Sequence, residues 1–215
     1  MSQKDIDIIY RILKIKLKGY SIPLAEQVHF KKKDPFFVLI ATILSARTKD
    51  TTTSKVCDKL FLKIKSFQDI EKYSQKNIEK LIYPVGFYKT KASHLKELPK
   101  KIKELFNGKV PDTIDELLKL PGVGRKTANL IVSVCFNKPA ICVDTHVHRI
   151  TNRIGFIKTN NPLDTEIKLR SILPKKYWSD TNYLFVILGQ NICMPRNPNC
   201  NICPINKYCK KINVL

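Results

Sequence analysis

The sequence predicts an all-α protein. Apolar residues recur at helical spacing along most of the 215 residues, and no convincing strand ladder or internal repeat is present. Hydrophobic residues make up 43% of the chain, as expected of a protein with a packed core. Lys and Arg total 39 against 18 Asp and Glu, which gives a net charge of +21. This excess predicts a polyanionic partner, with nucleic acid favoured over an anionic membrane surface, although a high lysine content can also reflect nucleotide composition.

Ten helical segments are expected: 5–20, 34–46, 50–64, 74–84, 89–108, 113–120, 125–136, 144–155, 162–173 and 181–193. The first is amphipathic and should end at Gly19. The second is apolar, with Asp34 as its N-cap and Pro35 at its first position. Asp50 is the expected cap of the third, and Pro84 stops the fourth.

The later segments have equally clear ends. Gly108 closes the fifth, and Thr113 begins the sixth with Glu116 in capping-box spacing. The seventh is apolar nearly all round and should be buried. Asp144 is the expected N-cap of the eighth.

The turn Leu120-Pro121-Gly122-Val123-Gly124 joins the sixth and seventh segments. Pro121 stops one helix, while Gly122 and Gly124 permit unusual backbone angles and close approach of another backbone. The amides that begin the next helix then form a phosphate site. A helix-hairpin-helix DNA-binding element is favoured over an ordinary tight turn between core helices.

Lys126 lies in the first turn of the helix after this hairpin. It could simply meet a phosphate. A lysine at a helix N-terminus that is partly desolvated also has a lowered pKa, and its neutral amine can attack carbon to form a Schiff base. Asp144 could act only as an N-cap, or its carboxylate could stabilise a cationic sugar or transfer a proton.

Four cysteines crowd one segment near the C-terminus: Cys193, Cys200, Cys203 and Cys209. Their spacings of six, two and five residues predict a tight loop around a metal centre, either zinc or an iron–sulfur cluster. The total of seven cysteines is odd, which argues against a disulfide framework. Cys57, Cys135 and Cys142 have apolar neighbours and should be small buried side chains.

Together, LPGVGRKTA, VDTHVHR and the C-x6-C-x2-C-x5-C spacing resemble the endonuclease III family of helix-hairpin-helix DNA glycosylases. The resemblance implies two helical domains with DNA bound in a cleft between them. Residues 28–138 would form a six-helix bundle containing the hairpin. Residues 1–27 and 139–215 would form a discontinuous domain, and the loop 193–209 would bind a [4Fe-4S] cluster through its four cysteines.

The resemblance also implies an activity, that of a bifunctional DNA glycosylase and AP lyase of base excision repair. Lys126 matches the family's nucleophile and Asp144 its catalytic aspartate. The damaged base, mainly an oxidised pyrimidine, is flipped out and released, and β-elimination through a Schiff base cuts the strand 3′ to the abasic site. Mismatch-specific relatives commonly lack a lysine at this position.

Further DNA contacts are expected at Arg47 and Phe87. Most family members have glutamine where this chain has Arg47, whose longer charged side chain puts the preference for the opposite base in doubt. Phe87 could intercalate or could pack in the core. His146 could contact DNA and His148 should pack; at this spacing the pair should not chelate a metal. The remaining expected DNA contacts are Leu120, Gly122, Val123, Gly124, Arg125 and Thr145.

Two alternatives stay open: a non-catalytic helix-hairpin-helix DNA-binding protein, and a same-fold glycosylase for a mismatched or oxidised purine base. The longest apolar run, residues 35–44, is too short for a bilayer, and no signal peptide is recognisable. We therefore expect an intracellular, DNA-associated monomer without a membrane partner, in the cytoplasm or nucleoid if the source is bacterial. Its partner would be double-stranded DNA containing damaged bases or abasic sites.

Overall fold

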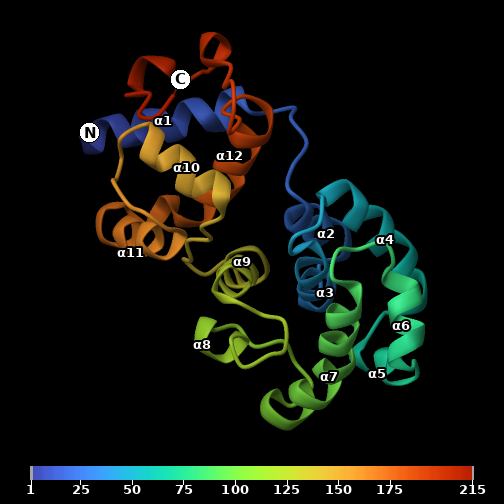
Figure 1. Ribbon diagram of the computed structural model, residues 1–215. Helices are drawn as coiled ribbons and strands as arrows, with labels where there is room; N and C mark the ends of the chain where they lie inside the picture. The colour runs from blue at the N-terminus through green and yellow to red at the C-terminus, as the bar shows by residue number, and fades with distance from the viewer. Residues whose placement is uncertain (1, 215) are drawn as a thin grey trace. The chain divides into compact units, whose positions relative to one another are not determined.

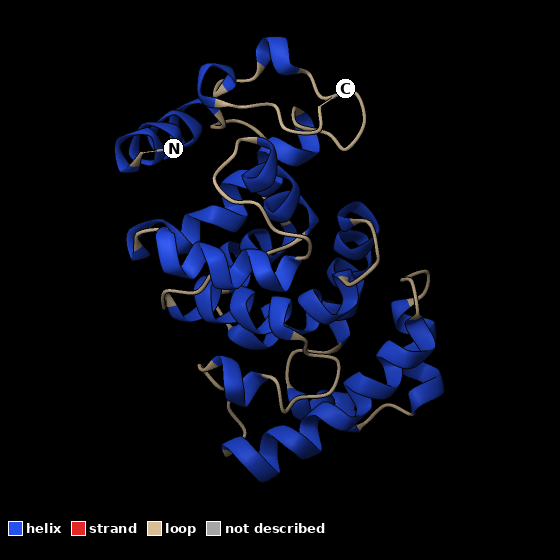
Figure 2. Ribbon diagram, turned by 60° about the vertical axis from the view of Figure 1, so that its left-hand side comes forward, coloured by secondary structure: helices blue, strands red, loops and turns tan. Residues whose placement is uncertain are grey.

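Helices are the only regular elements in residues 2–214, the part of the chain that the computed structural model describes, and Figure 2 shows them joined by loops without a strand. The all-α expectation is therefore confirmed. The helices are α1 Gln3–Lys16, α2 Leu24–Lys32, α3 Pro35–Ser45, α4 Asp50–Lys63, α5 Phe67–Glu71, α6 Gln75–Ile82, α7 Tyr88–Phe106, α8 Ile114–Leu117, α9 Arg125–Phe136, α10 Thr145–Arg153, α11 Pro162–Ile172 and α12 Trp178–Asn191, with short 3-10 turns η1 Lys175–Tyr177, η2 Cys200–Ile202 and η3 Asn206–Tyr208 (Figure 1).

The chain forms two compact units. One is Leu24–Lys138, which contains α2 to α9. The other combines the residues up to Pro23 with those from Pro139 onward, so α1 belongs with α10 to α12 and the cysteine loop. The six-helix count expected for the bundle stays a prediction.

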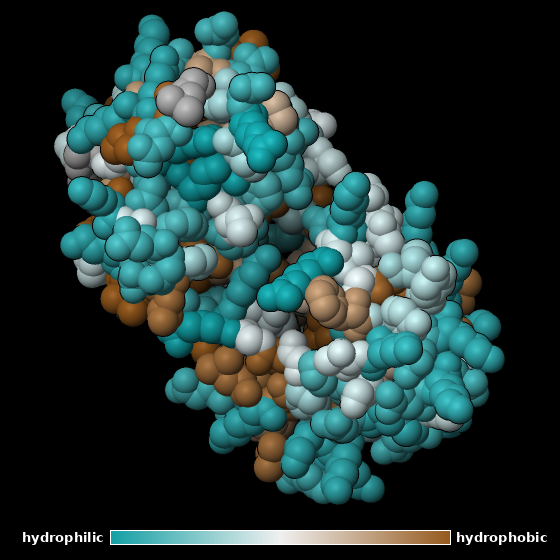
Figure 3. Space-filling model, in the orientation of Figure 1, coloured by the Kyte–Doolittle hydropathy of each residue, from teal (hydrophilic) through white to brown (hydrophobic). Residues whose placement is uncertain are grey.

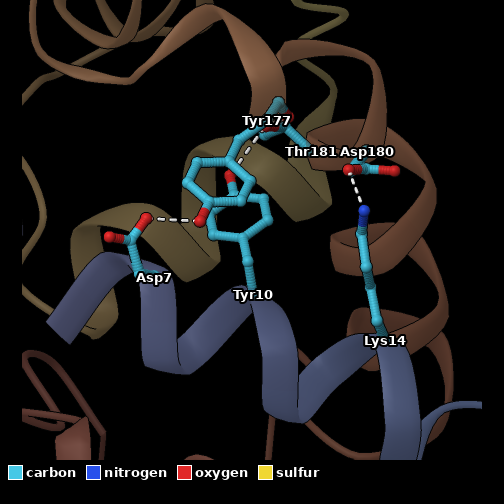
Figure 4. Close-up of polar contacts among 6 residues, drawn as sticks. All are labelled: Asp7, Tyr10, Lys14, Tyr177, Asp180 and Thr181. Atoms are coloured by element: carbon cyan, nitrogen blue, oxygen red, sulfur yellow. Dashed lines mark hydrogen bonds and ion pairs between the residues drawn. The ribbon is translucent and has the colours of Figure 1, made fainter. Parts of the chain in front are cut away.

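In the discontinuous unit, α1 is attached to the start of α12 (Figure 4). The Tyr10 hydroxyl, buried within the unit, donates a hydrogen bond of 2.7 Å to Thr181, whose own hydroxyl donates to the main-chain oxygen of Tyr177. The rings of Tyr10 and Tyr177 stack with centroids 4.3 Å apart. An ion pair of 2.6 Å joins Lys14 to Asp180. These contacts and the shared apolar core hold segments that are far apart in the sequence.

In the unit Leu24–Lys138, α3 is the central helix, and every residue from Phe36 to Leu44 is buried. It packs against α2, α4, α7 and α9. Asp34 caps it as expected, because its carboxylate accepts from the amide of Phe36 at 2.8 Å, and Pro35 is its first residue. The apolar composition of α3 is thus explained by contacts on several sides.

Three local expectations were wrong. Two helices, α2 and α5, were not anticipated: only Leu24, Ala25 and Val28 of α2 are buried, and α5 has five residues, so neither shows a sustained periodic pattern. Asp50 is the first residue of α4 and not its cap, and Lys49 at the cap position provides no side-chain hydrogen bond.

The surface drawn in Figure 3 is mostly hydrophilic, with a hydrophobic patch over α11, where Leu163, Ile167 and Ile172 are exposed. Within residues 2–214 no helix combines the length and the apolar character needed to cross a membrane.

Candidate functional site

The hairpin between α8 and α9 is anchored by buried side chains. Leu120 and Val123 point into the core, so only their main chain is available for contact with DNA. Gly122 has a φ of 76°, and a Cβ there would lie 2.8 Å from Nδ1 of His94, so both backbone angle and space require glycine. Gly124 does not use the conformational freedom of glycine: its φ is −96° and its ψ is 176°, an ordinary extended conformation. A Cβ at Gly124 would meet nothing within 4 Å, so this side of the hairpin is open.

Helix α9 begins directly after the hairpin. Its N-cap, Gly124, has no side chain to accept hydrogen bonds from the first amides. Arg125 and Lys126 in the first turn are both exposed, whereas Thr127 and Ala128 face the core. The partial desolvation expected for Lys126 is therefore not a property of the protein alone. Exposure of α9 is confined to its first two residues, because every residue from Thr127 to Phe136 is buried or half-buried.

Helix α10 begins in a different manner. Its N-cap is Asp144, and one carboxylate oxygen, Oδ1, accepts hydrogen bonds of 2.9 Å from the amides of both His146 and Val147. Asp144 is half-buried, and Thr145 beside it is exposed. The cap role expected of Asp144 is confirmed, and these bonds fix the direction of its carboxylate.

The two histidines of α10 have separate partners. Nδ1 of His146 lies 3.1 Å from a guanidinium nitrogen of Arg149, and Nδ1 of His148 lies 2.7 Å from the hydroxyl of Thr165. His148 thus packs against α11, as expected.

Arg47 and Phe87 lie on two neighbouring turns. Both have left-handed backbone conformations, with φ of 53° and 57°. The guanidinium carbon of Arg47 is 5.5 Å from the centre of the Phe87 ring, a cation–π distance. Phe87 is 60% exposed, so it does not pack in the core. The structure therefore presents a cation stacked on an aromatic ring at the surface.

The four C-terminal cysteines line one cavity whose other walls are mainly apolar, including Ile150, Ile154, Leu188, Ile192 and Ile205. Arg153 contacts the start of this loop. Its guanidinium donates hydrogen bonds to the carbonyls of Met194 at 2.6 Å and Pro195 at 2.7 Å. A guanidinium nitrogen also lies 3.5 Å from the sulfur of Cys193. This arginine is only 8% exposed and was not anticipated from the sequence.

The donor set fits a [4Fe-4S] cluster. Burial, together with the charges of the other three cysteines, raises the pKa of Cys203 to about 11. The four sulfurs are therefore close enough to interact, and Cys203 is unfavourable as a thiolate without positive metal beside it. No three donor side chains among residues 2–214 are placed to share one metal ion. A [4Fe-4S] cluster would instead be held by all four cysteines together, which line the same cavity.

The other cysteines are not part of this cavity. Cys57 and Cys142 are buried as expected, while Cys135 is only half-buried, which corrects the expectation of full burial. Burial raises the pKa of Cys57 and of Cys135 to about 12, so both are unreactive thiols.

Residues 40–175 match the family model of HhH-GPD superfamily base excision DNA repair proteins. An endonuclease III from Thermotoga maritima is 46% identical over 180 residues, covering 84% of this chain and 84% of that protein. The chain belongs to the endonuclease III family. Residues 193–209, which hold the four cysteines, match the iron–sulfur binding domain of endonuclease III, so the cofactor is a [4Fe-4S] cluster.

Solved structures agree with this membership. A non-covalent endonuclease III–DNA complex has a TM-score of 0.87 and 35% identity, covering 98% of this chain and 96% of that one. A trapped covalent endonuclease III–DNA intermediate has a TM-score of 0.86 and 36% identity, covering 98% and 97%. Lys126 belongs to the unit Leu24–Lys138 and Asp144 to the other unit, so their joint action is a proposal.

Proposed function

We propose that the chain is a bifunctional DNA glycosylase and AP lyase of base excision repair, with Lys126 as the nucleophile. The observation that carries the assignment is an exposed lysine in the first turn of α9, directly after the LPGVG hairpin, in a member of this family. The covalent DNA intermediate trapped in a relative supports a reaction of this kind. A net charge of +21 supports duplex DNA as the partner.

The first step exchanges one bond at the sugar for another. The neutral amine of Lys126 attacks C1′ of the flipped nucleotide, the N-glycosidic bond breaks, and the base leaves with the bonding electrons and takes up a proton. The amine loses a proton and the sugar ring opens to give the Schiff base. Contact with DNA excludes water from around Lys126, which supplies the desolvation that the free protein lacks.

The second step cuts the strand. The protonated Schiff base acidifies C2′, a base removes a proton there, and the electron pair expels the 3′ phosphate by β-elimination. Water then hydrolyses the Schiff base and returns Lys126 to its amine form. We propose that Asp144 stabilises the positive sugar in the first step or transfers a proton. Its attachment to two amides of α10 holds the carboxylate in a fixed direction for that task.

The remaining contacts are also proposals. The main chain of Gly122 and Gly124 and the side chains of Arg125, Thr145 and His146 would bind the DNA backbone, while Arg47 and Phe87 would contact the bases at the lesion. We propose that oxidised pyrimidines and abasic sites in duplex DNA are the substrates and that the protein acts as a monomer. When bound, the cluster cross-links the cysteine loop and stabilises its fold.

Borohydride trapping tests the proposal. Wild-type protein incubated with a duplex containing one abasic site should give a covalent protein–DNA band after reduction, and Lys126→Gln should lower the yield by about a thousandfold or more. The matched control is Lys119→Gln, an exposed lysine of the same hairpin region, which should trap like wild type. A wild-type protein with an intact cluster that gives no band would instead be a monofunctional glycosylase or a non-catalytic DNA-binding protein.

A further inference from the structure

Lys91 is a buried lysine on a helix face that is otherwise apolar. It lies near the start of α7 and is only 5% exposed. Leu95, Leu98 and Ile102 follow it at helical spacing on the same buried face. Because an ammonium group leaves water only at a large energetic cost, its surroundings must compensate for its burial.

The compensation comes from neutral acceptors on one turn. Nζ of Lys91 donates to the carbonyl of Leu44 at 2.7 Å, to that of Ala46 at 2.5 Å and to the hydroxyl of Thr48 at 3.2 Å. An ammonium has three donors, so all are used. The two carbonyls end α3, where the helix dipole also favours a cation. Lys91 therefore joins α7 to the turn that carries Arg47.

A second turn is attached to the same point. The hydroxyl of Thr48 accepts a hydrogen bond of 3.1 Å from the amide of Gly86. A Cβ on Gly86 would lie 2.9 Å from the carbonyl oxygen of Arg47 and 3.3 Å from the Thr48 hydroxyl. Only glycine allows this approach without displacement. The residue after Gly86 is Phe87, the cap of α7.

Both turns are conformationally demanding. Arg47 and Phe87 each have positive φ, which costs energy for residues with a Cβ and persists only where the surroundings enforce it. Lys91, Thr48 and Gly86 are those surroundings. The result is an exposed ring with a guanidinium 5.5 Å from its centre, both on braced main chain.

We propose that Lys91 is a positioning residue for lesion recognition, which joins the Arg47 and Phe87 turns into one rigid surface element that enters the DNA at the damaged site. Lys91 itself is too deeply buried to touch DNA. The inference rests on the proposed function and assigns to that function a residue outside the reacting groups.

The test measures binding without chemistry. The probe is a duplex with a tetrahydrofuran abasic analogue, which cannot form a Schiff base, opposite 2-aminopurine, whose emission rises when it is unstacked. Lys91→Met keeps the length of the side chain but removes its donors. It should weaken binding about tenfold and abolish the emission increase, because the Phe87 ring would no longer be held in position to stack on a base.

Lys96→Met is the matched control. Lys96 lies on the same helix and also donates to two carbonyls, those of Glu71 at 2.9 Å and Tyr73 at 2.7 Å, but it does not touch either recognition turn. It should lower stability while leaving affinity within about twofold of wild type and the emission increase intact. Equal losses in both variants would overturn the positioning role, since they would reflect general destabilisation.

Gly86→Ala keeps the test decisive if Lys91→Met does not fold. It leaves Lys91 in place and pushes the Phe87 turn away from Arg47, so it should show the same loss of emission. Wild-type emission from both folded variants would overturn the inference. Failure of the proposed function is separate: it would appear as absent borohydride trapping by wild type on a natural abasic site, whatever these binding measurements show.

Discussion

Two regions of irregular main chain are stabilised in the same way. One is the cysteine loop, and the other is the pair of turns that carry Arg47 and Phe87. Each has a buried cation that donates to carbonyls: Arg153 binds those of Met194 and Pro195, and Lys91 binds those of Leu44 and Ala46. Both cations lie on helices, which supply rigid backbone. A buried cation on a helix can therefore replace regular secondary structure over a few residues.

The two regions differ in length. Four residues separate α3 from α4 at the Arg47 turn, whereas the cysteine loop follows α12 and contains only the short turns η2 and η3. Ordering each additional residue costs about 1–2 kcal/mol of conformational entropy, so two carbonyl contacts cannot hold a seventeen-residue loop. Because of its length, the cysteine loop needs the additional cross-link of four cysteines and a cluster, whereas hydrogen bonds alone can hold a short turn.

The largest expected effect is loss of the cluster from the cysteine loop. Cys203→Ser should abolish the visible iron–sulfur absorption, and amide exchange within residues 194–208 should accelerate about a hundredfold or more. Exchange at residues 46–49 should not change, because Lys91 holds them without metal. Cys142→Ala, a buried cysteine of the same unit, should keep the absorption. A Cys203→Ser protein that retains its absorption would refute the ligand assignment.

An intermediate effect is expected when the charge is removed from the other region. Arg47→Gln should raise the dissociation constant for the tetrahydrofuran duplex about threefold and reduce the salt dependence of binding by about one counterion. Titrations at several salt concentrations measure both quantities. Arg11→Gln, the same change at an exposed position of α1, should leave them as in wild type. If Arg47→Gln also behaves as wild type, Arg47 does not contact the DNA.

The smallest expected effect is a change with pH in the contribution of Lys91 to the free energy of unfolding. Burial lowers the pKa of Lys91 from 10.5 to about 8, within the range where lysine, unlike arginine in general, can lose its proton. Between those two values the unfolded chain binds more protons at this residue than the folded chain, so stability rises with pH. The difference in unfolding free energy between wild type and Lys91→Met, measured by urea denaturation, should therefore shift in favour of wild type from pH 7.5 to pH 9.5. A difference that is constant or moves the opposite way would contradict the lowered pKa.

Much of the site was predictable because its signals are local. The cap at Asp144, the hairpin glycines and the three spacings between the four cysteines each depend on residues close together in the sequence. Lys91 left a weaker signal: a lysine in register with Leu95, Leu98 and Ile102 on an apolar face. Its position on this apolar face could have predicted that Lys91 is buried. The sequence could not have predicted its hydrogen-bond acceptors, because they are more than forty residues away.

The all-α class, the hairpin, the metal loop and the family follow from the sequence alone, since helix periodicity, turn chemistry and ligand spacing are properties of short segments. The tertiary structure decided that Phe87 is exposed, that Gly124 is extended, and that Lys91 and Arg153 brace main chain from a distance. The physical reason is that burial and hydrogen-bond partners depend on which helices pack together, and that choice is made by the whole chain.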